Sequence, residues 1–199
     1  MSGSAKILLF MGSTRDGRMC DRVTKFVLQQ LKDEKPNYDV EVIDPKELNF
    51  PVLVQPLHFY RDPKEAPQAL HTLHEKIKDA AGYWIVTPEY NRQLPPALTN
   101  TLNHFPPASY AYRPGAIVTY SLGPQGGILS AHQCRNYFAE FGCVPVSAMV
   151  HVPTVNQVLD ENGKCSNDRT KGALSKVIAQ FDWWLKATQN QKAAEGLPK

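Results

Sequence analysis

Apolar residues follow two alternating patterns along the chain. Short runs are apolar at every position or at every second position, which is typical of strands in a sheet covered by helices. Between these runs, apolar residues recur every three or four positions, which predicts amphipathic helices. The first pattern predicts five strands, at residues 7–10, 40–43, 83–86, 116–120 and 146–152. The second predicts five helices, around residues 23–31, 70–81, 95–105, 128–141 and 174–185.

Strands that alternate with helices predict an α/β fold, in which an open, doubly wound sheet carries helices on both faces. We expect Gly82 to end the second helix and Gly142 to cap the fourth. Residues 1–199 are expected to form a single domain, because this length suits one well-buried core. Residues 190–199 are polar and small, and we expect a flexible tail there.

Composition and charge exclude several classes of function. The net charge is only +3 and the basic residues form no cluster, which argues against a nucleic-acid partner. No stretch approaches the ~20 apolar residues of a membrane span. The chain leads directly into its first strand, so we expect no secretory signal and a cytoplasmic protein with reduced thiols. The four cysteines lack a C-x-x-C pair and the spacing of metal ligands.

The loop after the first strand carries the residues of an anion site. Ser13, Thr14, Arg15 and Arg18 lie between an apolar strand and a helix, where hydroxyls, free amides and the helix dipole favour a phosphate. The loop lacks the Gly-Lys-Ser/Thr ending of a Walker loop and the Gly-x-Gly-x-x-Gly of dinucleotide sites. A mononucleotide phosphate fits it better, which points to FMN. The alternative is an ordinary polar turn between a strand and a helix.

Two further unusual loops are expected on the same edge of the sheet. Residues 88–91 follow the third strand and residues 121–127 follow the fourth. In open α/β sheets, ligands bind outside the carboxyl ends of the strands. Each loop alone could be a turn or a close-packing glycine segment. Three such loops on one edge favour a binding site.

These motifs resemble the NADPH-dependent FMN reductase family of flavodoxin-like proteins, which includes quinone, azo-dye and chromate reductases. The resemblance covers about residues 6–153. It is carried by Met11-Gly-Ser-Thr-Arg15, Thr87-Pro-Glu-Tyr-Asn91 with the following Leu94-Pro-x-Ala-Leu-x-Asn100, and Ser121-x-Gly-x-x-Gly-Gly127. It implies a flavodoxin-like sheet of five parallel strands in the order 2-1-3-4-5. It also implies a non-covalent FMN that relays a hydride from NADPH or NADH to quinones, free flavin or similar acceptors in a ping-pong mechanism.

The resemblance also implies roles for particular residues. The phosphate would be held by Ser13, Thr14, Arg15 and Arg18. The isoalloxazine edge would be lined by Pro88, Glu89, Tyr90 and Asn91, with the Asn91 amide meeting its carbonyls, and the pocket would be completed by Ser121, Gly123, Gly126 and Gly127. The backbone of Gly126 or Gly127 is the expected donor to reduced flavin. No catalytic side chain and no metal are expected, because the cofactor carries the chemistry.

Two other functions remain open from the sequence. One is a flavodoxin-type electron carrier without pyridine-nucleotide activity, although such carriers are strongly acidic and this chain is not. The other is a flavin-binding protein whose task is a redox-regulated interaction. A yellow protein that NADPH bleaches under anaerobic conditions distinguishes the reductase from both.

Residues 45–66 are predicted to be irregular and rich in proline and aromatics. The apolar 50–60 segment predicts a contact surface, and hence a homodimer or higher homo-oligomer, unless it folds back on its own sheet. Cys20 follows the phosphate loop, where a helix dipole could lower its pKa, but a buried filler is the favoured interpretation. His71 and His74 share a predicted helix face without a third metal ligand.

Overall fold

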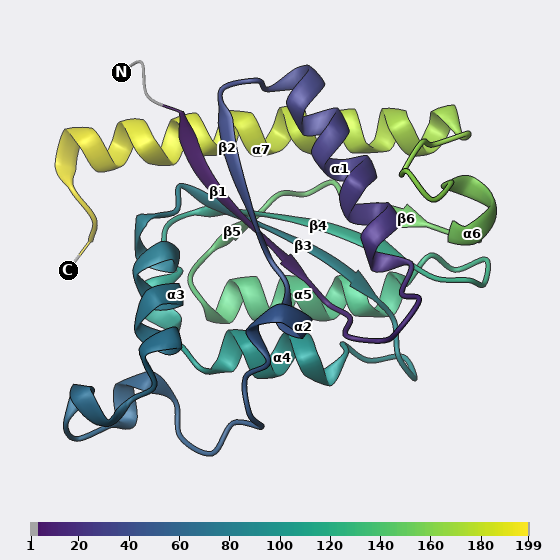
Figure 1. The fold of residues 1–199 in the computed structure, drawn as a ribbon. Helices are drawn as coiled ribbons and strands as arrows, with labels where there is room; N and C mark the ends of the chain where they lie inside the picture. Colours follow the sequence, from purple (N-terminus) through teal and green to yellow (C-terminus); the bar gives the residue numbers. More distant parts are fainter. Residues whose placement is uncertain (1–3, 199) are drawn as a thin grey trace.

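A parallel sheet forms the centre of the protein in the computed structural model, which describes residues 4–198 (Figure 1). Within those residues the sheet has six strands, and the path through it runs β2-β1-β3-β4-β5, with β6 beside β4. This confirms the expected order 2-1-3-4-5. The strands are β1 (Ala5–Met11), β2 (Tyr38–Ile43), β3 (Gly82–Pro88), β4 (Pro114–Tyr120), β5 (Val144–Pro145) and β6 (Val150–Val152).

Helices cover both faces of the sheet, as the pattern predicts. Residues Ile7 and Leu9 of β1 point into a core that α1 (Cys20–Glu34) and α7 (Asp168–Glu195) close. The alternate residues Leu8 and Phe10 point into a second core, which is closed by α3 (Gln68–Asp79), α4 (Pro96–Asn103) and α5 (Ile128–Glu140). Every residue of β3 and β4 is buried, which accounts for their continuous apolar runs.

The predicted fifth strand over residues 146–152 is wrong, because only Val150–Val152 of that range forms a strand (β6), and an irregular segment separates it from β5 at Val144–Pro145. Side chains satisfy the backbone in the gap. Arg135 donates to the carbonyl oxygens of Val146 and Ser147, and the Ala148 amide donates to Gln180. Pro145 also lacks the N–H that a continuing ladder needs. The chain therefore pairs with β4 at β5, separates from it over the irregular segment, and pairs with it again at β6.

Two predicted helix ends are also wrong. The second helix stops at Asp79 rather than at Gly82, because the Ala81 amide donates to the carbonyl of Lys6 and Gly82 already belongs to β3. The flexible tail predicted at 190–199 is placed too early in the sequence, because α7 continues through Glu195 and ends at Gly196. Residues 190–195 are exposed, but they include alanine, glutamine, lysine and glutamate, which favour helix without any packing.

The segment at 45–66 is less irregular than predicted. It contains α2 (Pro45–Leu48) and two single turns of 3₁₀-helix, Leu57–Phe59 and Pro63–Glu65. Short elements also occur at Pro107–Ser109 and at α6 (Val155–Val158).

Candidate functional site

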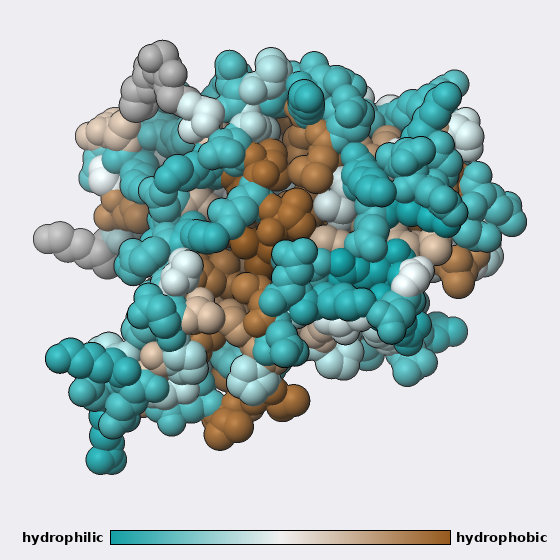
Figure 2. Space-filling model, viewed as in Figure 1, coloured by the Kyte–Doolittle hydropathy of each residue, from teal (hydrophilic) through white to brown (hydrophobic). Residues whose placement is uncertain are grey.

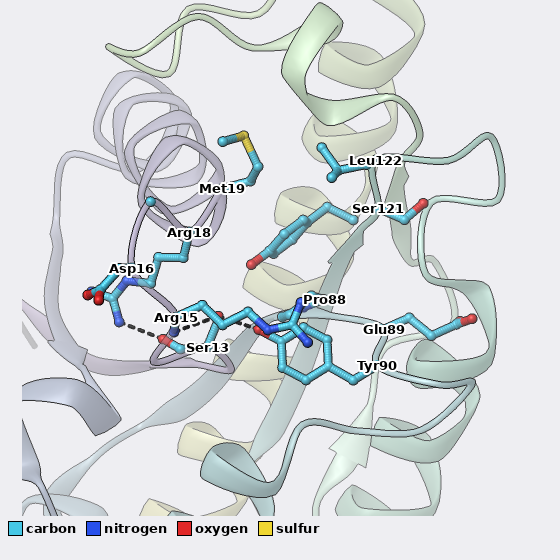
Figure 3. Close-up of a pocket in the computed structure, with 12 residues that line it drawn as sticks. Ser13, Arg15, Asp16, Arg18, Met19, Pro88, Glu89, Tyr90, Ser121 and Leu122 are labelled. Carbon is cyan, nitrogen blue, oxygen red and sulfur yellow. Dashed lines mark hydrogen bonds between the residues drawn. The ribbon is translucent and has the colours of Figure 1, made fainter.

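A pocket of about 320 Å³ lies at the carboxyl edge of the sheet, where β1, β3 and β4 end (Figure 3). The three loops that the sequence singles out meet there, so the expected convergence is present. The lining comprises Ser13, Arg15, Asp16, Gly17, Arg18, Met19, Pro88, Glu89, Tyr90, Tyr120, Ser121 and Leu122.

Seven of the twelve predicted site residues line this pocket: Ser13, Arg15, Arg18, Pro88, Glu89, Tyr90 and Ser121. The other five lie in the same loops but outside the lining: Thr14, Asn91, Gly123, Gly126 and Gly127. Thr14 and Asn91 are exposed, whereas Gly126 and Gly127 are buried behind the pocket wall.

Sequence reasoning missed five lining residues, of which Tyr120 is the most informative. Tyr120 is the last residue of β4 and pairs in register with Pro88, the last residue of β3. The last residue of a parallel strand lies at the carboxyl edge of the sheet, where ligands bind. The position of Tyr120 at the end of its strand is therefore the signal that could have predicted it as a site residue. Met19 and Leu122 add apolar surface, and Asp16 and Gly17 complete the first loop.

The loop at residues 12–19 presents its backbone to the pocket. Gly12 passes so close to β3 that a Cβ atom there would lie 2.1 Å from Thr87 Oγ1, so the turn needs glycine at this point. No side chain caps α1. Among residues 4–198, most amides from the loop into the first turn of α1 donate to no protein acceptor: Thr14, Asp16, Gly17, Met19, Cys20 and Arg22. Such a group of amides at a helix N-terminus attracts anions.

Tyr90 links the first loop to the loop after β3. Its hydroxyl is hydrogen-bonded to the Ser13 hydroxyl at 2.6 Å, and the Arg15 guanidinium carbon lies 3.7 Å from its ring centroid. Figure 3 shows Arg15 lying across the Tyr90 ring. The next residues make a tight turn, in which Asn91 and Arg92 both have positive φ and the backbones of Tyr90 and Gln93 exchange two hydrogen bonds. This turn points Asn91 toward solvent instead of toward the pocket.

Glu89 caps the helix that follows the third loop. Its carboxylate accepts hydrogen bonds from the amides of Leu129 at 2.9 Å and Ser130 at 3.3 Å, in the first turn of α5. A negative charge at a helix N-terminus is favourable, and two otherwise free donors are satisfied. Glu89 therefore fixes α5 against the end of β3.

The loop at residues 121–127 is held by its own hydrogen bonds. Ser121 Oγ donates to the Gly123 carbonyl at 2.8 Å and accepts from the Gly126 amide at 2.9 Å. Gly126 and Gly127 both have positive φ, which allows the sharp entry into α5. Of the two glycine amides expected to face the flavin, that of Gly126 is thus bound to Ser121 in this structure.

Burial controls the ionisation of the groups behind the pocket. It raises the pKa of the Cys20 thiol, which is fully buried and close to the Val86 carbonyl at 3.4 Å. The complete burial of Cys20 agrees with the buried-filler interpretation. Burial, with Cys20 nearby, also raises the pKa of Tyr120 far above its usual value, so that its hydroxyl stays protonated.

Residues 4–198 contain neither a cluster of metal-ligating side chains nor a membrane-spanning helix. Nowhere in this range do three or more His, Cys, Asp or Glu side chains group as a metal site would need. No helix there combines the length and the hydropathy needed to cross a bilayer.

Comparison with known proteins places residues 5–157 on the model of the family described as NADPH-dependent FMN reductase. An NAD(P)H-dependent FMN reductase of Schizosaccharomyces pombe is 27% identical over 193 residues, which is 94% of each chain. A quinone reductase of Pseudomonas putida is 27% identical over 139 residues, 65% of this chain and 74% of the relative. The quinone reductase of Escherichia coli is 38% identical over 120 residues, 58% and 64% of the two chains.

Solved structures with this fold include two of different function. FerB, a flavoenzyme NAD(P)H:(acceptor) oxidoreductase from Paracoccus denitrificans, superposes with a TM-score of 0.74 at 20% identity, over 92% of this chain and 98% of FerB. A flavodoxin from Pseudomonas aeruginosa superposes with a TM-score of 0.53 at 14% identity, over 89% and 99% of the two chains. At these identities the likeness concerns the fold, which is flavodoxin-like.

Proposed function

Because the chain belongs to the NADPH-dependent FMN reductase family, we propose that it passes a hydride from NADPH or NADH, through non-covalently bound FMN, to quinones, free flavin or similar small acceptors. The observation that carries this proposal is the group of free amides between Thr14 and Arg22, beside Arg15 and the pocket. A dianionic phosphate is the ligand that such a group suits best.

The residues of the loop fit the phosphate of FMN. Ser13 and Thr14 supply hydroxyls, and Arg15 supplies a formal positive charge. Arg15 forms no ion pair with a carboxylate within residues 4–198, so its charge is available to an anion. Arg18 belongs to the same set of expected phosphate residues and lines the same pocket.

The other two loops fit the ring system. Pro88, Glu89, Tyr90 and Ser121 line the pocket together with the apolar surfaces of Met19, Tyr120 and Leu122. We retain Asn91, Gly123, Gly126 and Gly127 as members of the proposed site on the family resemblance. The amide of Gly127 is the stronger candidate for a donor to the ring, because the Gly126 amide already donates to Ser121.

The chain's own contribution to the reaction is binding and orientation. Bound FMN supplies the two-electron chemistry, so no side chain needs to act as a general base. The Ser13–Tyr90 hydrogen bond joins the first loop to the loop after β3 across the pocket. The apolar rim at Leu122, which is 66% exposed, suits a planar organic acceptor better than a charged one.

The absorbance spectrum of the purified protein tests this function. We expect a flavin spectrum that bleaches when NADPH or NADH is added without oxygen and returns when a quinone is added. A flavin spectrum that neither nucleotide bleaches would favour an electron carrier or an interaction protein. Riboflavin, which lacks the phosphate, is expected to bind poorly.

Steady-state kinetics test the order of the two substrates. If donor and acceptor use the same face of the flavin in turn, the two half-reactions are separate. Double-reciprocal plots at several acceptor concentrations are then expected to be parallel, as in a ping-pong mechanism. Intersecting lines would indicate that donor and acceptor bind together and would contradict a shared face.

We also propose a homodimer, or a higher homo-oligomer, and a cytosolic location. The dimer is supported by exposed apolar residues in the 50–60 loop, namely Val52, Val54 and Phe59. The location is supported by the four cysteines, which are all free and buried, as in a reducing compartment.

A further inference from the structure

Arg18 lines the pocket but directs its charge elsewhere. Its Nη1 donates to Asp44 Oδ1 at 2.7 Å, and its Nη2 donates to Asp44 Oδ2, so the two side chains form a bidentate pair. Its Nε donates to Asp21 at 2.8 Å. The side chains of Arg18 and Asp44 are only 10% and 9% exposed. Figure 3 shows that the Arg18 side chain runs outward, away from Tyr90 and Ser121.

The same guanidinium holds the backbone of the phosphate loop. Arg18 Nη1 also donates to the carbonyl oxygen of Ser13 at 2.5 Å. This contact turns the Ser13 carbonyl toward Arg18. Of the amides that follow it, that of Thr14 donates to no protein acceptor within the described residues, whereas that of Arg15 donates to Ser13 Oγ at 3.4 Å. Arg18 is therefore placed to set the shape of the loop.

Asp44 is a fixed anchor for this contact. It follows β2 directly and caps α2, where its carboxylate accepts from the Lys46 amide at 2.9 Å and its carbonyl accepts from the amides of Glu47 and Leu48. These bonds do not depend on the phosphate loop. An oriented carboxylate that is held from its own element can orient a partner on another element.

The two arginines of the loop thus differ in their surroundings. The charge of Arg18 faces two carboxylates, Asp44 and Asp21, and its hydrogen bond to Asp44 raises the pKa of Arg18 further. Arg15 is exposed and rests on the Tyr90 ring. A bidentate pair with a carboxylate is a strong contact to break.

We propose that Arg18 and Asp44 are a positioning pair, which holds the loop at residues 12–19 in the shape that presents its amides to the FMN phosphate, while Arg15 provides the direct charge contact. The inference rests on the proposed function, since it concerns the same site. It assigns Arg18 an indirect role through Ser13 and assigns Asp44, 26 residues away in sequence, to the cofactor site.

Binding of FMN and riboflavin to the full-length protein freed of flavin, measured by quenching of flavin fluorescence, tests the pair. In D44N the anchor is weakened and Arg18 is released. If the pair positions the loop, D44N binds FMN at least about tenfold more weakly, with little change for riboflavin.

The double variant R18A/D44A then binds FMN no more weakly than R18A alone, because both substitutions remove the same interaction. The matched control is D182N, which removes a similarly buried carboxylate at the opposite edge of the sheet, where Asp182 contacts Lys35 and Tyr38.

The alternative is that Arg18 contacts the phosphate directly. Releasing Arg18 in D44N would then leave FMN binding unchanged or tighter, and this result would overturn the proposal. If D44N does not fold at the assay temperature, R18K decides, because lysine keeps the charge but cannot make the bidentate pair and the Ser13 contact together. We expect R18K to lose FMN affinity as R18A does; retention near wild type would contradict the proposal. Wild-type protein that binds neither flavin would overturn the proposed function itself.

Discussion

At the scale of single residues, the phosphate site depends on the difference between an available arginine and one that is already paired. Replacing Arg15 by alanine is expected to weaken FMN binding by about 1.5–3 kcal/mol, the usual contribution of a hydrogen bond to a charged group. Titration of flavin-free protein with FMN measures the loss. Riboflavin serves as the control ligand, because the substitution should leave its binding nearly unchanged. Equal loss for both flavins would mean that Arg15 supports the ring wall through Tyr90 instead.

Asp44 gives the protein a predicted sensitivity to acid. Burial works to raise the pKa of Asp44, but the hydrogen bonds from Arg18 and from the Lys46 amide, together with the positive charges of both side chains, outweigh burial and hold the pKa below the ordinary value of 3.8. Since the folded pKa is the lower one, the unfolded chain binds the proton first as pH falls. The stabilisation from this pair is present above pH 3.8 and is lost as pH falls through that value toward the folded pKa.

Urea denaturation from pH 7 to pH 3 measures this effect. The wild-type free energy of unfolding should fall more steeply in the acid range than that of D44N, whose residue 44 does not titrate. Parallel curves for the two proteins would show that Asp44 contributes nothing to the acid dependence.

The sequence predicts some site residues and conceals others for physical reasons. Ser13 and Arg15 are found because they directly follow an apolar strand. Tyr120 is missed as a site residue because it is the last residue of an apolar strand and is assigned to the buried strand instead of to the loop that follows. The partner of Arg18 is hidden as well, because nothing local connects residue 18 to Asp44; only the pairing of β1 with β2 brings them together.

At the scale of elements, α5 depends on a residue outside itself. Glu89 lies after β3 and caps the first turn of α5 across the site. Replacing it by alanine is expected to lower the free energy of unfolding by about 1 kcal/mol, the usual cost of a lost N-terminal cap. Denaturation by urea measures this cost. The control is E140A in the last turn of the same helix, where an exposed glutamate should change stability by less than about 0.5 kcal/mol. Similar values for both variants would contradict the cap.

Element boundaries show which signals a sequence lacks. The interior strands are predicted well because complete burial forces a continuous apolar run, as in β3. The division between β5 and β6 is not visible, because it depends on Arg135 and Gln180, two side chains from other elements that satisfy the backbone between the strands. The end of α7 is missed because exposed helix has no apolar stripe.

At the scale of the whole molecule, the order of the strands follows from the alternation of strand and helix together with the family resemblance, whereas the outer surface does not. The 50–60 loop illustrates this. Leu57 is buried and its amide donates to the His104 carbonyl at 2.8 Å, and Phe50 packs on the edge of the His104 ring. Asn100 ties the loop to α4 through Pro51 and Leu53. The loop thus folds back on its own domain in part.

The remaining part of this loop is exposed and apolar. Val52 is 84% exposed, Val54 96% and Phe59 66%. The loop passes below α2 and α4 at the lower margin of Figure 1, where Figure 2 shows a group of hydrophobic atoms at the surface. Such a group on a fixed loop is a candidate contact surface, because a two-fold axis would bury the same patch on both partners.

We therefore expect a homodimer that this loop joins. Light scattering at micromolar concentration should give twice the 22.3 kDa mass of the chain. Replacing Val54 and Phe59 together by aspartate should give a folded monomer, because both side chains are exposed and their loss costs the monomer little. The control is Trp183→Asp, at another exposed aromatic on α7, which should leave the dimer intact. If the α7 variant dissociates and the loop variant does not, the interface lies on α7. A wild-type monomer that binds FMN and oxidises NADPH would exclude any need for a second copy.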